Sequence, residues 1–456
     1  MKNINKNNTK IADFWIENKA NNTVICKLSP RNCELKEGQM GFCGVRGNVG
    51  GSLHTYNYGV GVEATIETIE TEAVYHFKPG TKILSLGNVG CMMACKFCQN
   101  WTTSQVRHLN KSNLRFFTPE GIIKMAKDNA IDIISWTYND PVVWHEFVKD
   151  TSRLAKEAGI KTLYKTALYI EPEPLEELIE LIDVFSVSLK SMNAKMYRKF
   201  TKGELAPVLN AILQIAKSKA HLEISQLIVT DINDDGTDAQ KTAQWIIENI
   251  GNHIPLHFVG YHPAYVYNKP RTPLSVLLNA RNIAKKEGIK YCYLGNVYRD
   301  DVSNTHCTNC NNLLIQRFGL TIINKGLNKQ NKCTKCGTIA PIKGVIKGLE
   351  NNYKPSGINF IEKETVQWSI EKNSLHIIQT KGDKLHIKVI REPEDKEEYY
   401  ELNKGIERLI LSKATADENQ IKISTTDNEA VTIVPVLDRA HYPVLNMSKN
   451  SEKYIN

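Results

Sequence analysis

Short apolar segments alternate with amphipathic helical patterns between residues 82 and 294. The apolar segments lack strict alternation with polar residues, which is typical of strands buried on both faces. They span 82–86, 131–136, 161–165, 183–189, 222–229, 255–259 and 290–294. The helical patterns start at Thr118-Pro119, where a capping residue precedes a proline at the first helical position, and continue near 141–158, 173–181, 204–218, 237–249 and 273–287.

This order of elements predicts an α/β fold with a parallel sheet and right-handed crossovers. A barrel and an open, doubly wound sheet both satisfy the pattern. In either arrangement the active-site groups lie at the C-terminal ends of the strands.

The flanking segments have a different character. Residues 22–80 combine short β-like stretches with many glycines, and four cysteines lie within 303–347. Beyond residue 350, five segments alternate apolar and polar positions and are interrupted by the acidic run EPEDKEEYYE. We therefore expect four parts: an N-terminal glycine- and cysteine-containing segment (1–80), the α/β domain (81–300), a metal-binding module (301–347) and a small β-rich C-terminal domain (348–456).

Composition and charge indicate the cellular compartment of the protein and the classes of partner that it can have. The 456 residues are 41% hydrophobic and 23% charged, and no apolar run reaches the length of about 20 residues that a membrane span needs. The first ten residues are polar and lack the apolar core of a signal peptide. We expect a cytoplasmic protein with no membrane partner. The net charge of +9 comes from lysines spread along the chain rather than from a basic stripe, so we expect no nucleic-acid partner.

The eleven cysteines point to metal binding, because cytosolic thiols are normally kept reduced. Cys91, Cys95 and Cys98 form a CxxxCxxC pattern directly after the predicted strand 82–86. A cubane iron–sulfur cluster takes four ligands, so three thiolates leave one iron open for chemistry. The alternatives are a zinc knuckle and three unligated core thiols, but zinc sites usually combine a CxxC pair with a distant second pair.

With Phe97 the motif reads CxxxCxΦC, and the sequence resembles the radical S-adenosylmethionine (SAM) superfamily. Over about residues 24–345 it is similar to the radical SAM enzymes of the AmmeMemoRadiSam system, which are related to pyruvate formate-lyase activating enzymes. The shared segments include GQMGFCGVRGNVGGSL, CQNW, TYNDP, MYRKFTKGELAPVL, PLHFVGYHP and YLGNV.

The resemblance implies a partial (β/α) barrel of the radical SAM type. It also implies a 4Fe-4S cluster at which SAM is reductively cleaved to a 5′-deoxyadenosyl radical that abstracts hydrogen from a substrate. A protein, a peptide or a small molecule could be that substrate, and a reductant such as flavodoxin or ferredoxin would supply the electron. No catalytic residue is expected beyond the cluster ligands.

The same resemblance suggests which side chains line the SAM pocket. Asp140 lies where the family usually has a glutamate that meets the SAM amino group, although Asp140 could instead cap the helix that begins at Pro141. Lys190 matches a lysine that could pair with the SAM carboxylate, but Ser188 replaces the aspartate of the family's DLK. The full set of expected pocket residues is Phe97, Asn100, Asp140, Lys190, His257 and His262.

A second cysteine set comprises two CxxC pairs separated by 22 residues: Cys307, Cys310, Cys333 and Cys336. This spacing is typical of a zinc ribbon or a rubredoxin-like site, with zinc as the leading metal and iron as the alternative. Four thiolates saturate the ion, so we expect a structural role.

A third set, Cys26, Cys33 and Cys43, supports two interpretations. It could bind a metal with a fourth ligand from elsewhere, or its thiols could be buried as small apolar groups. Relatives commonly show CxLCPxxC, and Ser29 stands where that pattern has a further cysteine. The remaining cysteine, Cys292, is expected in the core.

One function from another class fits the same residues. The chain could be a non-catalytic iron–sulfur and zinc scaffold that binds nucleic acid or a partner protein. Asp140, Ser188 and Ala167 depart from the family pattern and favour this alternative, whereas the intact three-cysteine motif favours the enzyme.

Overall fold

The computed structural model describes residues 8–297, 302–318 and 321–348, and beyond these only the strands between residues 358 and 436. Two compact units divide the chain after Asn296. Within the described residues, no helix is both long enough and apolar enough to cross a membrane.

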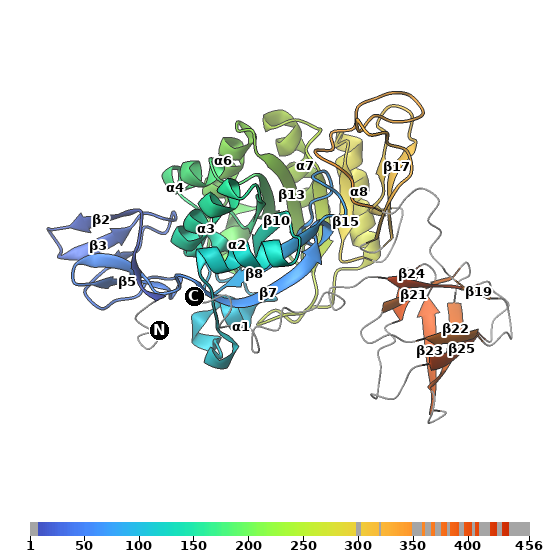
Figure 1. The fold of residues 1–456 in the computed structure, drawn as a ribbon, viewed down its shortest axis with the longest axis horizontal. Coiled ribbons are helices and arrows are strands. Elements are labelled where there is room, and N and C mark those ends of the chain that lie inside the picture. The colour runs from blue at the N-terminus through green and yellow to red at the C-terminus, as the bar shows by residue number, and fades with distance from the viewer. Residues whose placement is uncertain are drawn as a thin grey trace. The chain divides into compact units, whose positions relative to one another are not determined.

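The first unit contains a nine-stranded sheet, in the order β15-β14-β13-β12-β11-β10-β8-β7-β9, with helices packed around it (Figure 1). Strands β8 and β10 to β15 run parallel, each beside the next in sequence. They confirm the seven predicted apolar segments: β8 Lys82–Asn88, β10 Ile133–Thr137, β11 Lys161–Thr166, β12 Val184–Leu189, β13 His221–Ile228, β14 Leu256–Gly260 and β15 Cys292–Gly295. Since β15 and β9 are separate edges, the sheet is an open, partial barrel, as the family resemblance implies.

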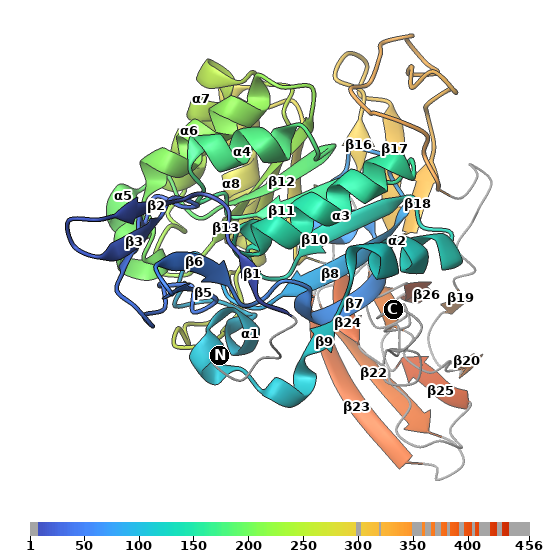
Figure 2. The ribbon, with the colours of Figure 1, turned by 60° about the vertical axis from the view of Figure 1, so that its left-hand side comes forward.

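Helices connect these strands and cover the outer face of the curved sheet (Figure 2). The helix that begins at Pro119 is capped as predicted, because the Thr118 hydroxyl accepts a hydrogen bond of 3.0 Å from the Gly121 amide. The predicted helix at 141–158 divides into a 3-10 turn, Pro141–Trp144, and α3. The helices of eight residues or more are α2 Pro119–Asp128, α3 His145–Glu157, α4 Pro172–Ile179, α6 Leu205–Ala216, α7 Thr237–Asn249 and α8 Leu274–Glu287, and two short helices are α1 Trp101–Ser104 and α5 Ala194–Met196.

The sheet begins earlier than the sequence-based boundary at residue 81. Strand β7 (Val60–Thr68) pairs antiparallel with β8, and β9 (Arg115–Phe116) pairs with β7. These strands were not expected in the barrel, because their pairing is non-local and leaves no parallel-sheet pattern. The residues before Val60 form two small antiparallel sheets, β1-β6-β5 and β2-β3-β4, from β1 Lys10–Ile11, β2 Trp15–Asn18, β3 Thr23–Cys26, β4 Glu34–Leu35, β5 Arg46–Val49 and β6 Ser52–Thr55.

The second unit holds the four-cysteine module and the predicted β-rich region. The module contains the antiparallel sheet β16-β17-β18, from β16 Thr305–His306, β17 Leu313–Phe318 and β18 Thr321–Asn324. Two four-stranded antiparallel sheets follow, β19-β26-β21-β24 and β20-β25-β22-β23. Their strands are β19 Ile358–Phe360, β20 Val366–Ser369, β21 Leu375–Thr380, β22 Lys384–Arg391, β23 Lys396–Asn403, β24 Ile406–Leu409, β25 Gln420–Thr425 and β26 Val431–Val436.

One expectation for this region is wrong. The acidic run was predicted to interrupt the strands, yet most of it lies in β23, which pairs along its whole length with β22. β23 is an edge strand, and charged side chains are common at edges because they discourage pairing with other chains. Lys388 on β22 forms a 2.6 Å ion pair with Glu397 on β23.

Candidate functional site

The loop that carries Cys91, Cys95 and Cys98 follows the C-terminal end of β8 and leads into α1 (Trp101–Ser104). Its backbone is fixed by a short π-helical segment, Tyr197–Thr201. The amide of Ala94 donates to the carbonyl of Thr201, and the amide of Lys96 donates to the carbonyl of Phe200, both at 2.9 Å. Such π-helical turns often occur at functional sites. The π-helical segment therefore fixes the backbone of the loop, and the three cysteines of the loop are half-buried.

The apolar residues between the cysteines are buried, so they can shield a cluster on this loop from water. Met92, Met93 and Phe97 each expose 4% or less of their surface. Phe97 packs in a cluster with Met196, Val229 and Tyr261. Burial raises the pKa of Cys95 to about 12, although the charge of Lys190 acts in the opposite direction. Bound metal reverses this preference, because a coordinating thiol is deprotonated.

Asp140 lies just beyond the C-terminal end of β10 and is buried. Its Oδ1 accepts hydrogen bonds from the Thr166 hydroxyl at 2.8 Å and from the Val142 amide at 3.3 Å. Its Oδ2 accepts one bond, from the Ala167 amide at 3.3 Å. The carboxylate thus caps the turn after it, as one prediction stated, and still has acceptor capacity for a further donor.

Burial raises the pKa of Asp140, while the hydrogen bond from Thr166 and the charge of Lys190 lower it. Lys190 directly follows β12. Its charge also lowers the pKa of Cys95, so the Lys190 ammonium lies within electrostatic range of both the carboxylate and the cysteine loop. The structure therefore places Asp140, Lys190 and the cysteine loop, all of which the sequence predicted to bind the cofactors, at the same edge of the sheet.

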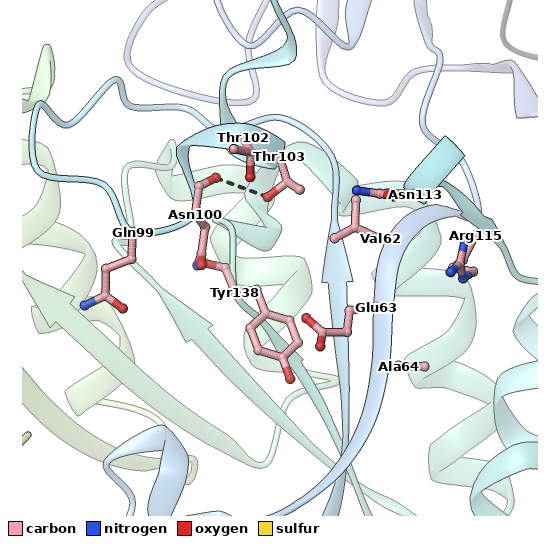
Figure 3. A pocket seen from close by; sticks show the side chains of 10 residues that line it. All are labelled: Val62, Glu63, Ala64, Gln99, Asn100, Thr102, Thr103, Asn113, Arg115 and Tyr138. Atoms are coloured by element: carbon pink, nitrogen blue, oxygen red, sulfur yellow. Dashed lines mark hydrogen bonds between the residues drawn. The ribbon is translucent and has the colours of Figure 1, made fainter. Parts of the chain in front are cut away.

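A cavity of about 380 Å³ lies beside the cysteine loop (Figure 3). Asn100 lines it, and the Asn100 amide donates a 2.5 Å hydrogen bond to the carbonyl of Tyr138. Most of the other lining side chains are polar; the lining consists of Val62, Glu63, Ala64, Gln99, Asn100, Thr102, Thr103, Asn113, Arg115 and Tyr138.

Several of these residues were missed by the sequence interpretation. Glu63 is on β7 and Arg115 is on β9, the two strands whose membership of the sheet was not expected. Tyr138 lies within the shared segment TYNDP, and this segment was the one feature of the sequence that could have identified Tyr138 as a site residue. The Tyr138 hydroxyl forms a hydrogen bond with the Thr65 hydroxyl.

The two predicted histidines lie at different places. His257 is the second residue of β14, near the N-terminal end of that strand, and its Nε2 lies 2.8 Å from the Glu223 carboxylate. This position is remote along the strand from the C-terminal edge where Asp140 and the cysteine loop lie. His262 follows β14 at that C-terminal edge and is half-buried.

The four sulfurs of Cys307, Cys310, Cys333 and Cys336 all lie within 4.8 Å of one another. The Cys307–Cys336 and Cys310–Cys333 sulfur pairs are 3.5 and 3.6 Å apart. Tetrahedral thiolate ligation at a metal–sulfur distance near 2.3 Å requires sulfurs about 3.8 Å apart, so the set fits a single ion. Zinc and iron share this geometry, and both stay open as occupants.

Cys26, Cys33 and Cys43 also come together, around a small cavity of about 10 Å³ that Ser29 lines with them. Cys292, in contrast, is buried within β15.

The chain is similar to one protein family and to several known proteins. Residues 85–246 match the profile of the radical SAM superfamily. An uncharacterized protein of Methanocaldococcus jannaschii is 39% identical over 327 residues, which cover 71% of this chain and 97% of that protein. The pyruvate formate-lyase-activating enzyme of Listeria monocytogenes is 22% identical over 185 residues, 39% of this chain and 74% of the enzyme. Among solved structures, a domain of the activating enzyme from Bacteroides vulgatus aligns with a TM-score of 0.32 at 19% identity, covering 36% of this chain and 98% of that domain.

Proposed function

Because the chain belongs to the radical SAM superfamily, we propose that Cys91, Cys95 and Cys98 hold a 4Fe-4S cluster and that the enzyme uses it to cleave SAM. One observation carries this proposal. Three half-buried thiols on a single loop lie at the C-terminal edge of the sheet, with a carboxylate and an ammonium group close by. With both cofactors bound, one electron would cleave a C–S bond of SAM and yield a 5′-deoxyadenosyl radical that abstracts hydrogen from a substrate.

The side chains around the loop would orient SAM. The Oδ2 atom of Asp140 has acceptor capacity for the SAM amino group, since it accepts only one hydrogen bond from the described residues. Lys190 would pair with the SAM carboxylate. Phe97, buried beside Cys95, would keep water away from the reacting groups.

The cavity beside Asn100 would hold the substrate. Its volume of about 380 Å³ falls in the usual range for small-ligand pockets, and the lining supplies both an acidic and a basic side chain, Glu63 and Arg115. These features support a polar small molecule or one polar side chain of a protein or peptide. Similarity to an enzyme that is named for activating another protein supports a protein or peptide substrate.

Release of 5′-deoxyadenosine from SAM tests the proposal. The full chain is reconstituted anaerobically with iron and sulfide and reduced with dithionite, and the nucleoside is measured by chromatography. We expect release from the native protein and from Cys292→Ala, whose buried thiol is on β15, and none from Cys95→Ala.

Cleavage that requires substrate would appear only after cell extract is added. If release is still absent then, and SAM does not alter the EPR signal of the reduced cluster, the enzyme is rejected in favour of the non-catalytic scaffold.

A further inference from the structure

The cysteines at positions 26, 33 and 43 meet although they lie on three different parts of the N-terminal segment. Cys26 ends β3, and its amide donates a 3.0 Å hydrogen bond to the carbonyl of Cys33. Cys43 lies in the turn before β5. All three line one small cavity of about 10 Å³, together with the hydroxyl-bearing residue Ser29, which is 5% exposed.

Arg46 lines the same cavity and is only 1% exposed. One of its nitrogens, Nη2, donates to the Glu146 carboxylate at 2.5 Å and to the Asp13 carbonyl at 2.9 Å. Its other two nitrogens, Nε and Nη1, are buried with no hydrogen-bond partner among the described residues. Buried guanidinium groups are normally fully bonded, so these atoms indicate a ligand with acceptor character in the cavity.

A second guanidinium group, that of Arg31, also lines the cavity. Its charge acts on Cys33, Cys43 and Cys91. Burial raises the pKa of Cys26 and raises that of Cys43 to about 11, so the free thiols are neutral and a bound metal would be needed to make them thiolates. The Arg31 guanidinium donates to the carbonyls of Met92 and Lys202, so of these two arginines only Arg46 has buried nitrogens without a partner among the described residues.

We propose that Cys26, Cys33 and Cys43 bind a second metal centre, separate from the catalytic loop, with the Ser29 hydroxyl or a water molecule as the fourth ligand. The Nε and Nη1 atoms of Arg46 donate hydrogen bonds to its sulfur atoms. Thiolate ligands select zinc, copper(I) and iron–sulfur clusters, and the centre holds zinc or iron in thiolate ligation.

The geometry bears on which metal is bound. Among the described residues, the sets whose donor atoms all lie within 4.8 Å are the four-cysteine module and the Asp13, His145 and Glu177 group. The sulfurs of Cys26, Cys33 and Cys43 are thus spread more widely than those of the module. The cavity between them has a volume of about 10 Å³, which is room for a single ion, and thiolate ligation of that ion requires the three sulfurs to move together.

Metal content of the full chain tests the proposal in a background that lacks the catalytic ligands. The variant Cys91→Ala/Cys95→Ala/Cys98→Ala is purified anaerobically, and iron, zinc and acid-labile sulfide are measured per chain. We expect the one ion of the four-cysteine module plus a further centre: iron with sulfide identifies a cluster, and a second zinc identifies a single ion.

Adding Cys33→Ala should remove that further centre, whereas adding Cys292→Ala as the matched control should keep it. Cys33 is half-buried, so its truncation is the mildest of the three. Metal limited to the one module ion, or an unchanged content in the Cys33→Ala variant, overturns the proposal.

A second readout needs no variant. Alkylation of the native chain is followed by peptide-resolved mass spectrometry before and after metal removal. The Cys33 thiol should be protected at first and should react several-fold faster once the metal is removed. Equal rates before and after removal would also overturn the proposal.

Discussion

The Nε atom of Arg31 donates a 2.6 Å hydrogen bond to the carbonyl oxygen of Met92, the residue directly after Cys91. The Nη2 atom of the same side chain donates to the carbonyl of Lys202, at the end of the π-helical segment. The guanidinium carbon also lies 3.5 Å from the centre of the Phe42 ring. One N-terminal side chain thus joins the small N-terminal sheets, the cysteine loop and the segment that supports this loop.

We expect Arg31→Ala to weaken this junction. Loss of charge-assisted hydrogen bonds on a half-exposed side chain should cost about 1.5 kcal/mol of unfolding free energy. It should also increase the rate at which the reconstituted chain loses iron, because the Met92 carbonyl is no longer held. Urea denaturation and iron content over time measure both effects. Arg153→Ala, on the exposed face of α3, is the control, and an equal iron loss in both variants would contradict the expectation.

Asp140→Asn separates capping from cofactor binding. Asparagine caps a helical turn about as well as aspartate does, so the stability of the chain should hardly change. Loss of the negative charge should weaken SAM binding by about 10-fold, since a hydrogen bond to a charged group contributes about 1.5 kcal/mol or more. Calorimetric titration of the reconstituted chain with SAM measures this.

Asp140→Glu restores both the charge and the residue that the family usually has, and it should bind SAM more tightly than Asp140→Asn does. Unchanged affinity in Asp140→Asn would leave Asp140 with the capping role alone.

Glu223 should make the stability of the first unit pH-dependent. Burial would raise the pKa of this carboxyl, but hydrogen bonds from His221 and His257, at 2.9 and 2.8 Å, hold its pKa well below the ordinary value. A lowered pKa in the folded state stabilises the fold fully above the unfolded pKa of about 4.3, and this contribution is lost as the pH falls towards the folded pKa.

Glu223→Gln should therefore cost about 3 kcal/mol at pH 7 and progressively less below about pH 4. Denaturation curves at pH 7 and below about pH 4 measure this cost, and Glu173→Gln, at an exposed position, is the control. A cost that does not depend on pH would show that the charge of Glu223 contributes nothing.

Removing the metal from the four-cysteine module should unfold residues 302–348 selectively. The module has only a small apolar core, formed by residues such as Leu314, Ile315 and Ile322, and a structural zinc contributes on the order of 10 kcal/mol to such a domain. We expect Cys310→Ala to lose one metal ion per chain and to be cleaved within the module by trypsin, while residues 60–296 stay protected. Cys292→Ala should retain the ion, and resistance of the Cys310→Ala module to trypsin would show that the metal is dispensable.

Local sequence alone determined the strands and helices of the barrel. Strands buried on both faces must be apolar throughout, and helices that cover a sheet must be amphipathic. Each of these patterns can be recognised within one short stretch of sequence. The CxxxCxxC and paired CxxC spacings are local in the same sense, because ligands for one cluster or ion come from one short loop or two. The capping hydroxyl of Thr118 was equally visible.

Contacts between residues far apart in the chain could be established only from the tertiary structure. Glu63 and Arg115 line the cavity because β7 and β9 join the sheet by antiparallel pairing, which no local pattern records. The charged strand β23 is stable because a neighbouring strand pairs with it. Arg46 meets Glu146 across 100 residues and is buried beside three cysteines, so its unpaired nitrogens become visible only in the folded chain. Sequence specifies the groups that carry chemistry, whereas long-range packing decides which of them share one environment.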